Sequence, residues 1–151
     1  FKGWEEIKNE SHGHTTISRR VNRVPITFPA LMYAQKVQKR IAAGGVQLPN
    51  SKAEIGAIRK ILDEAESKID SGESIDKDAV GALLFSAASL ARQEKVDREE
   101  ALSLYNKDFV ALFNNIEKFS LQNHINFDTM DFATLKSLWQ SENRSAEDES
   151  K

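Results

Sequence analysis

The sequence predicts an all-α fold of four to six helices. Its 151 residues contain only three prolines and seven glycines, and the turn-forming residues do not recur at the spacing of short strands. Apolar residues recur at steps of three and four in several segments, which is the period of an amphipathic helix. Residues that begin or end helices flank these segments. Together these observations favour a bundle of helices over a sheet.

The first helix with clear boundaries is expected over residues 30–43. Pro29 suits the first turn of a helix, and Gly44–Gly45 can end one, because glycine accepts left-handed backbone angles. Before it, residues 1–9 have the pattern of the end of a short helix. Residues 11–23 have no hydrophobic period and are expected to form a loop. The apolar face of the helix consists of Leu31, Ala34, Val37 and Ile41, and the loop carries a basic cluster of Arg19, Arg20 and Arg23.

Two further helices are expected on either side of a loop around Gly72. Ser51 and Glu54 have the spacing of a capping box at the start of the first helix, and Asp76 can cap the second. Apolar residues recur at helical spacing in both helices. They are Ile55, Ile58, Ile61 or Leu62, Ala65 and Ile69 in the first, and Val80, Leu83, Leu84, Ala87, Leu90 and Ala91 in the second.

A turn at 95–97 separates this pair from another helix, where Asp97 begins a second capping-box pattern. A loop is expected over 122–130, and Asp131 opens a last short helix. Residues 145–151 are polar and are expected to be disordered. The apolar positions of the two helices are Leu102, Tyr105, Phe109, Leu112 or Phe113 and Ile116, and then Leu135, Leu138 and Trp139.

Composition narrows the classes of function. Lys plus Arg is 21 and Asp plus Glu is 23, so the net charge is −2 and no global field attracts nucleic acid. There is no cysteine, which excludes disulfides and thiolate metal sites. No apolar run is long enough for a membrane span, and no signal peptide is visible. We therefore expect a cytoplasmic protein. Since it begins with Phe, we also expect a piece of a longer polypeptide, with a further domain possible before residue 1.

Five segments carry a family resemblance. The helix expected after Asp76 has the order G-x-L-L-F-x-x-x-x-L-A-R, from Gly81 to Arg92. The others are WEEIKNE from Trp4, VPITFPALMYAQKVQKR at 24–40, NKDFVALF at 106–113 and MDFATLKSLWQ at 130–140. In this order they resemble the MazG family of nucleoside triphosphate pyrophosphohydrolases, and its C-terminal type of domain in particular.

The resemblance implies a helical domain that hydrolyses nucleoside triphosphates to the monophosphate and pyrophosphate, and that dimerises through its helices. In the family, two helices each present a pair of carboxylates three residues apart, on one helical face. Four carboxylates then converge on Mg²⁺, which prefers oxygen ligands. The implied organisation here is a short helix and basic loop at 1–23, the MazG-like domain at 24–141 and a polar tail at 142–151.

Several family positions have lost their functional residue type. The second carboxylate pair falls on Ala79 and Ala82. The first pair falls on Glu64 and Ser67, or, if the register slides by one residue, on Asp63 and Glu66. A family lysine is replaced by Asp108 and a family arginine by Leu112, whereas the nucleotide-contacting positions at Lys60, Asn106 and Trp139 are retained.

Each candidate also has a simpler structural interpretation. Asp63, Glu64 and Glu66 can form a solvated helix face, and Trp139 can be a core residue. Asp76 and Asp78 can be helix-start acids rather than substitute ligands, His12 and His14 lack a third metal ligand, and the arginine cluster either binds an anion or faces solvent.

Three hypotheses for the function follow. The chain is a catalytically degraded MazG-type domain that serves as a dimerisation or regulatory module. Alternatively, it is a working Mg²⁺-dependent pyrophosphohydrolase with a non-standard site at Asp63, Glu64 and Glu66, aided by Asp76 or Asp78. The third hypothesis is a nucleotide-sensing domain that binds a nucleoside triphosphate without cleavage, through Lys60, Trp139 and the arginine cluster.

Overall fold

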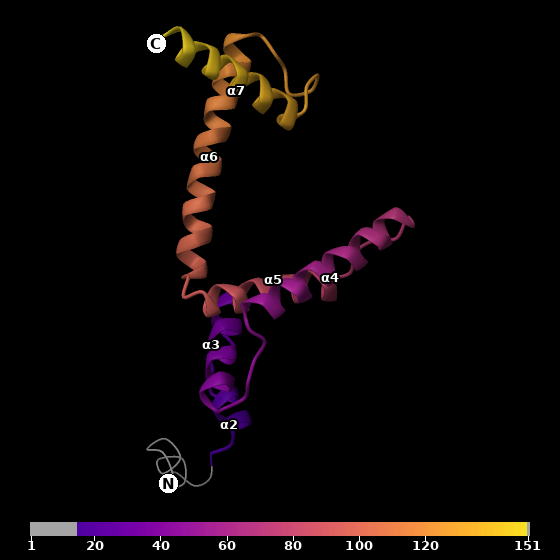
Figure 1. Cartoon of the computed structure of the whole chain (residues 1–151), viewed down its shortest axis with the longest axis vertical. Helices are drawn as coiled ribbons and strands as arrows, with labels where there is room; N and C mark the ends of the chain where they lie inside the picture. Colours follow the sequence, from indigo (N-terminus) through magenta and orange to yellow (C-terminus); the bar gives the residue numbers. More distant parts are fainter. Residues whose placement is uncertain (1–14, 151) are drawn as a thin grey trace. The chain divides into compact units, whose positions relative to one another are not determined.

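A computed structural model of the chain describes residues 15–150 (Figure 1). Within this range the chain forms six helices and no strand, so the all-α prediction is confirmed. Contacts divide the chain into two compact units, the first ending at Arg98 and the second beginning at Glu99. The helices are α2 (Ile17–Asn22), α3 (Ala30–Ala43), α4 (Ser51–Asp70), α5 (Lys77–Gln93), α6 (Arg98–Gln122) and α7 (Phe132–Glu149). In this part of the chain no helix is both long and apolar enough to span a bilayer.

The centre of the first unit is the helical pair α4 and α5 (Figure 1). The side chain of Gln93, at the end of α5, donates to the carbonyl of Pro49, just before α4 begins. At the other end of the pair, Lys68 of α4 contacts Asp76, which precedes α5. The start of α4 therefore lies beside the end of α5, and the end of α4 lies beside the start of α5, so the two helices form an antiparallel hairpin. Helix α3 packs on α5, and α2 packs on α3.

Helix ends in the first unit follow the expected chemistry, with one exception. Asp76 caps α5, and its Oδ1 accepts from the N–H of Ala79 at 2.8 Å. The cap of α4 is Asn50, whose Oδ1 accepts from the N–H of Ala53 at 2.8 Å. The capping box predicted at Ser51 is therefore wrong. Ser51 is already the first helical residue, and the side chain of Asn50 caps the helix instead.

Two segments expected to lack structure are helical. Within the loop expected at 11–23, residues 17–22 form α2, which Thr16 caps by accepting from the N–H of Arg19. Six residues are too few to show a hydrophobic period, and contact with α3 supports the helix. At the other end, α7 runs to Glu149, through most of the polar tail. Its residues after 141 are mostly good helix formers, so propensity continues the helix without an apolar face. The helix expected at 1–9 lies outside the described residues.

Burial in the first unit differs from the predicted core. The buried side chains on α3, α4 and α5 are Gln38, Glu54, Ser86, Ala88 and Ser89. Several apolar side chains expected in the core are instead exposed, namely Ile55, Leu62, Ile69, Val80, Leu84 and Ala87. The buried side chain of Gln38 joins α3 to α5, because its Nε2 donates to the carbonyl of Phe85 at 3.3 Å. A single chain thus leaves much of its predicted apolar face in contact with solvent.

The second unit is held together by apolar and aromatic contacts between α6 and α7. Ile116 of α6 and Leu135 of α7 are fully buried. Phe113 stacks on Phe127 and on Phe132, with ring centroids 5.8 and 6.1 Å apart. Asp131 caps α7 as predicted, with its Oδ1 2.7 Å from the N–H of Thr134.

Candidate functional site

The helical pair α4 and α5 carries the positions at which the family resemblance implies metal ligands. Glu64 and Ser67 on α4 are exposed, as is Ala82 on α5, while Ala79 is half-buried. These four positions offer one carboxylate, one hydroxyl and two methyl groups. The resemblance implies four converging carboxylates as oxygen ligands of Mg²⁺, and three of the four are missing here. This set of donors therefore does not fit a Mg²⁺ site of the kind that the resemblance implies.

In the alternative register, the first ligand pair is Asp63 and Glu66, and the geometry of α4 shows which way these two side chains point. The side chains that pack toward the rest of the first unit recur along one stripe, which includes the half-buried Ile61 and Ala65. With about 100° of rotation per residue, Glu64 lies about 60° from Ile61, whereas Asp63 lies about 160° and Glu66 about 140° away. Asp63 and Glu66 thus point away from the packed stripe, and Glu64 lies at its edge.

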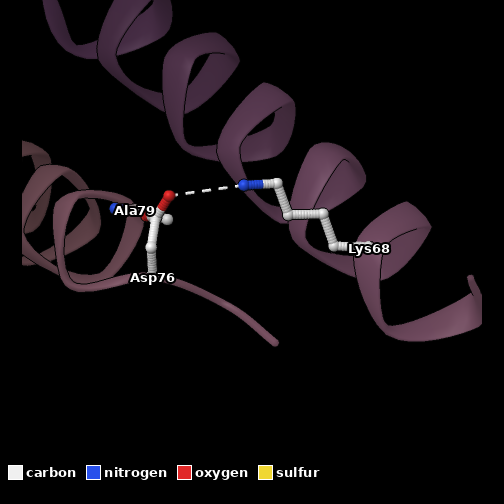
Figure 2. A network of polar contacts seen from close by, with 3 residues as sticks. All are labelled: Lys68, Asp76 and Ala79. Carbon is white, nitrogen blue, oxygen red and sulfur yellow. Dashed lines mark hydrogen bonds and ion pairs between the residues drawn. The ribbon is translucent and has the colours of Figure 1, made fainter. Parts of the chain in front are cut away.

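Asp76, the residue before α5, lies close in sequence to the two alanines, and its carboxylate accepts hydrogen bonds from two donors (Figure 2). Its Oδ1 accepts from the N–H of Ala79 at 2.8 Å, and its Oδ2 accepts from Lys68 Nζ at 3.3 Å. The hydrogen bond from Ala79, and then the Lys68 ammonium, hold the pKa of Asp76 below its ordinary value of 3.8. The carboxylate is consequently a helix cap and ion-pair partner. None of the hypotheses drawn from the sequence includes Lys68, because Lys68 meets Asp76 only when α4 and α5 form the hairpin.

Across residues 15–150, no three His, Cys, Asp or Glu side chains gather closely enough to hold a metal ion. His12 and His14 lie outside the described residues. Asp78 is exposed in the first turn of α5, which is the place of an acid that complements the helix dipole.

The expected nucleotide-contacting residues belong to both units. Lys60 is exposed on α4 of the first unit, and Asn106 and Asp108 are exposed on α6 of the second. Leu112 is half-buried. Trp139 is also half-buried, one helical turn after the fully buried Leu135, which agrees with a packing role for part of its ring. Nucleotide sensing through Lys60, Trp139 and the arginine cluster stays a prediction.

Two arginines of the cluster help to line a small cavity of about 310 Å³, which we call the arginine pocket. Arg20, Arg23 and Arg40 line it, and Arg19 is not among the described lining residues. Arg40 Nη1 donates to the carbonyl of Arg20 at 2.6 Å and ties α3 to α2. Sequence reasoning missed Arg40 because the arginine comes from another helix. Anion binding by these arginines stays a prediction.

Comparison with known proteins gives two kinds of result. No protein-family model matches the chain. The nucleoside triphosphate pyrophosphohydrolase of Escherichia coli K12 is 27% identical over 146 residues, covering 93% of this chain and 55% of that protein. The nucleoside triphosphate pyrophosphohydrolase/pyrophosphatase MazG of Thermotoga maritima is 26% identical over 140 residues, covering 93% and 54%. These matches support membership of the MazG family.

The family resemblance seen in the sequence is thereby confirmed, and it extends along most of the chain. The uncharacterized protein YabN of Bacillus subtilis is a further match, 29% identical over 138 residues, covering 90% of this chain and 28% of that protein. The chain spans about half the length of the first two relatives.

Proposed function

We propose that this MazG-family chain is a domain that no longer hydrolyses nucleoside triphosphates and acts as a self-associating, regulatory module. The observation that carries the proposal is the state of the α4–α5 face. Ala79 and Ala82 present methyl groups there, and the neighbouring carboxylate of Asp76 is bound to a backbone N–H and to Lys68.

Electrostatics support the loss of the reaction. Lys68 lies 3.3 Å from the Asp76 carboxylate, so a divalent cation at that carboxylate must displace the ammonium or be repelled by it. In the second unit, Asp108 places a negative charge where the resemblance implies a lysine. A carboxylate at that position repels a triphosphate rather than neutralising it. Both changes oppose the binding of metal-bound substrate.

Exposed apolar side chains support self-association. On α4, Ile55, Leu62 and Ile69 recur at steps of seven and are all exposed. On α5, Val80 and Leu84 recur at a step of four and are also exposed. Adjacent apolar stripes on a helical hairpin are the pattern of a helix-bundle interface. A second copy of the chain would cover them with stripes of the same kind, as a twofold dimer does.

An active enzyme with a non-standard metal site is the competing interpretation. It requires Asp63, Glu64 and Glu66 to act together, but the rotation along α4 separates Glu64 from the other two by 100° or more. Asp76 is not free to complete such a site, since both of its oxygens accept hydrogen bonds. The geometry therefore favours the non-hydrolysing domain.

Metal titration with a restored variant tests the proposal. Ser67→Glu/Ala79→Glu/Ala82→Asp returns carboxylates to the positions that the family resemblance implies. We expect calorimetry to show Mn²⁺ and Mg²⁺ binding by this variant and much weaker binding by the natural chain. The variant Thr27→Glu/Gln47→Glu/Gln140→Glu adds three negative charges at exposed positions outside α4 and α5 and serves as the charge-matched control.

Turnover provides the decisive measurement. The natural chain, incubated with the common nucleoside triphosphates and Mg²⁺, is expected to release no pyrophosphate above a blank. Release that EDTA stops and that Glu64→Gln abolishes would show an active enzyme and refute the proposal.

A further inference from the structure

The arginine pocket lies where the end of α2 meets the end of α3, and the function proposed above does not use it. Its described lining consists of three arginines and one alanine, which are Arg20, Arg23, Arg40 and Ala43. No carboxylate lines the pocket in the part of the chain that the structure describes. The whole chain has a net charge of −2, so the gathering of three arginines around one cavity is a local feature.

Packing of α2 on α3 holds two of these arginines in place. The guanidinium of Arg20 lies beside Gly44, since its Nη2 is 3.1 Å from the position that a Cβ on Gly44 would take. Arg40 Nη1 donates to the carbonyl of Arg20 at 2.6 Å. Arg23 is the exposed C-cap residue of α2 and completes the lining. An arginine that the fold already holds in position loses less conformational entropy when it binds a ligand.

Compensation of helix dipoles explains only part of this arrangement. Arg20 lies in the last turn of α2 and Arg40 in the last turn of α3, where cations complement the dipole. That role needs positive charge near a helix end, but it does not need three guanidinium groups around one cavity. It also leaves the Nε–H of Arg20 buried without an acceptor, which is a cost to the fold. Both features favour a ligand-binding pocket over dipole compensation alone.

We propose that the arginine pocket binds a small tetrahedral oxyanion, either inorganic phosphate or sulfate. Each guanidinium can donate a pair of hydrogen bonds to two oxygens of such an anion. Because a tetrahedral anion directs four oxygens away from its centre, arginines from two helices can contact it together. A planar carboxylate offers only two oxygens and carries a single charge. Like charges that share a cavity repel one another, and an anion between them removes that repulsion.

The lining also distinguishes this ligand from a nucleotide. Among the described lining residues there is no aromatic or large apolar side chain, so a base would find no surface to stack on. The volume of about 310 Å³ lies at the lower end of the range for small-molecule sites, about 300–1,000 Å³. The inference does not depend on the loss of hydrolysis, because α2 and α3 form the pocket and the binding needs no metal.

Calorimetric titration of the full chain with phosphate, sulfate and acetate tests the inference, with sodium chloride holding the ionic strength constant so that screening is equal. The test variant is Arg23→Gln, whose side chain is exposed, so the fold is retained. The control Arg19→Gln removes another exposed arginine of α2 that is not among the described lining residues. A further variant, Arg23→Lys, keeps the charge but removes the planar set of donors.

We expect the natural chain and Arg19→Gln to bind the tetrahedral anion with similar affinity. Arg23→Gln should bind it at least about tenfold more weakly, as after loss of one charge-assisted hydrogen bond, and Arg23→Lys should lie between the two. Acetate should bind the natural chain at least about tenfold more weakly than the tetrahedral anion does. Whichever of phosphate and sulfate binds more tightly is identified as the occupant.

Four results would overturn the inference. The first is no saturable binding of phosphate or sulfate. The second is an equal loss of affinity in Arg23→Gln and Arg19→Gln, which would show general attraction to positive charge. The third is binding of acetate as tight as that of phosphate and sulfate. The fourth is binding of ATP that is tighter than that of phosphate and is weakened by Arg23→Gln, which would show that the pocket serves a nucleotide.

Discussion

Self-association through the α4–α5 hairpin can be tested by shortening two of its exposed side chains. Leu62 and Leu84 are 49% and 50% exposed in the single chain, and they lie on the apolar stripes of α4 and α5. The variant Leu62→Ala/Leu84→Ala removes most of both side chains. Alanine is the best helix former, so neither helix is weakened by propensity. The variant thus probes the interface rather than the helices.

The size of the effect follows from the exposed fractions. Complete burial of a leucine side chain is worth about 1.5–3 kcal/mol, so covering the exposed half contributes about 0.8–1.5 kcal/mol. A twofold dimer contains each position twice, which gives four such contributions. Because alanine retains part of each contact, we expect a loss of about 3 kcal/mol, or a dissociation constant raised by roughly 100-fold or more.

Sedimentation velocity over a range of concentrations measures this dissociation constant, and circular dichroism checks that helix content is unchanged. Ile26→Ala is the matched control, since Ile26 is 86% exposed and lies before α3, outside the hairpin. An unchanged dissociation constant in the double variant, or an equal change in Ile26→Ala, would refute pairing through this face. A natural chain that remains monomeric at every concentration would refute it as well.

Three further predictions concern stability. Gly44→Ala is expected to lower the thermal midpoint, because the new Cβ would lie 2.7 Å from Ile17 Cγ1 and would force α2 away from α3, at a cost of about 1–3 kcal/mol; a midpoint equal to that of the natural chain would contradict this. Since folding lowers the pKa of Asp76, its carboxylate stabilises the fold above the ordinary pKa of 3.8, and this stabilisation is lost as the pH falls through the lower folded value. Asp76→Asn, which keeps a capping side chain but not the charge facing Lys68, should therefore show a thermal midpoint that falls less steeply than that of the natural chain on acidification below about pH 4. Phe113→Ala removes two ring contacts in the second unit and is expected to destabilise that unit by about 3 kcal/mol in urea unfolding, whereas a loss below about 1 kcal/mol would show that the stack is not important.

Helix positions were the part of the fold most open to prediction from sequence. The helix expected over 30–43 has those bounds in the structure, and the caps predicted at Asp76 and Asp131 are present. These features are local, since a cap depends on one side chain and the N–H groups of the next few residues. Helix α2 escaped prediction because it is short and is supported by contact with another helix.

Among the functional positions, too, local features could be predicted and contacts between helices could not. Motif order was enough to recognise the MazG family and to locate alanines at two expected ligand positions, because residue identity is a property of the sequence alone. The pairing of Lys68 with Asp76 could not be inferred, since the two charges meet only when α4 and α5 fold into a hairpin. The cavity between α3 and the end of α5 could not be inferred either, because its cations Lys36, Lys39 and Arg92 come from segments more than fifty residues apart.

By itself, the sequence determined most of the helices, the caps at Asp76 and Asp131 and the residue types at the family positions, since each of these depends on neighbours within one or two turns. Only the tertiary structure decided which charges are paired, which apolar stripes stay exposed and where cations converge, because these depend on how separate helices pack. Ile55, Leu62 and Val80 illustrate the difference, since their spacing indicates burial while the folded single chain leaves all three exposed. Periodicity identifies an apolar face, but only packing shows whether the chain itself covers that face.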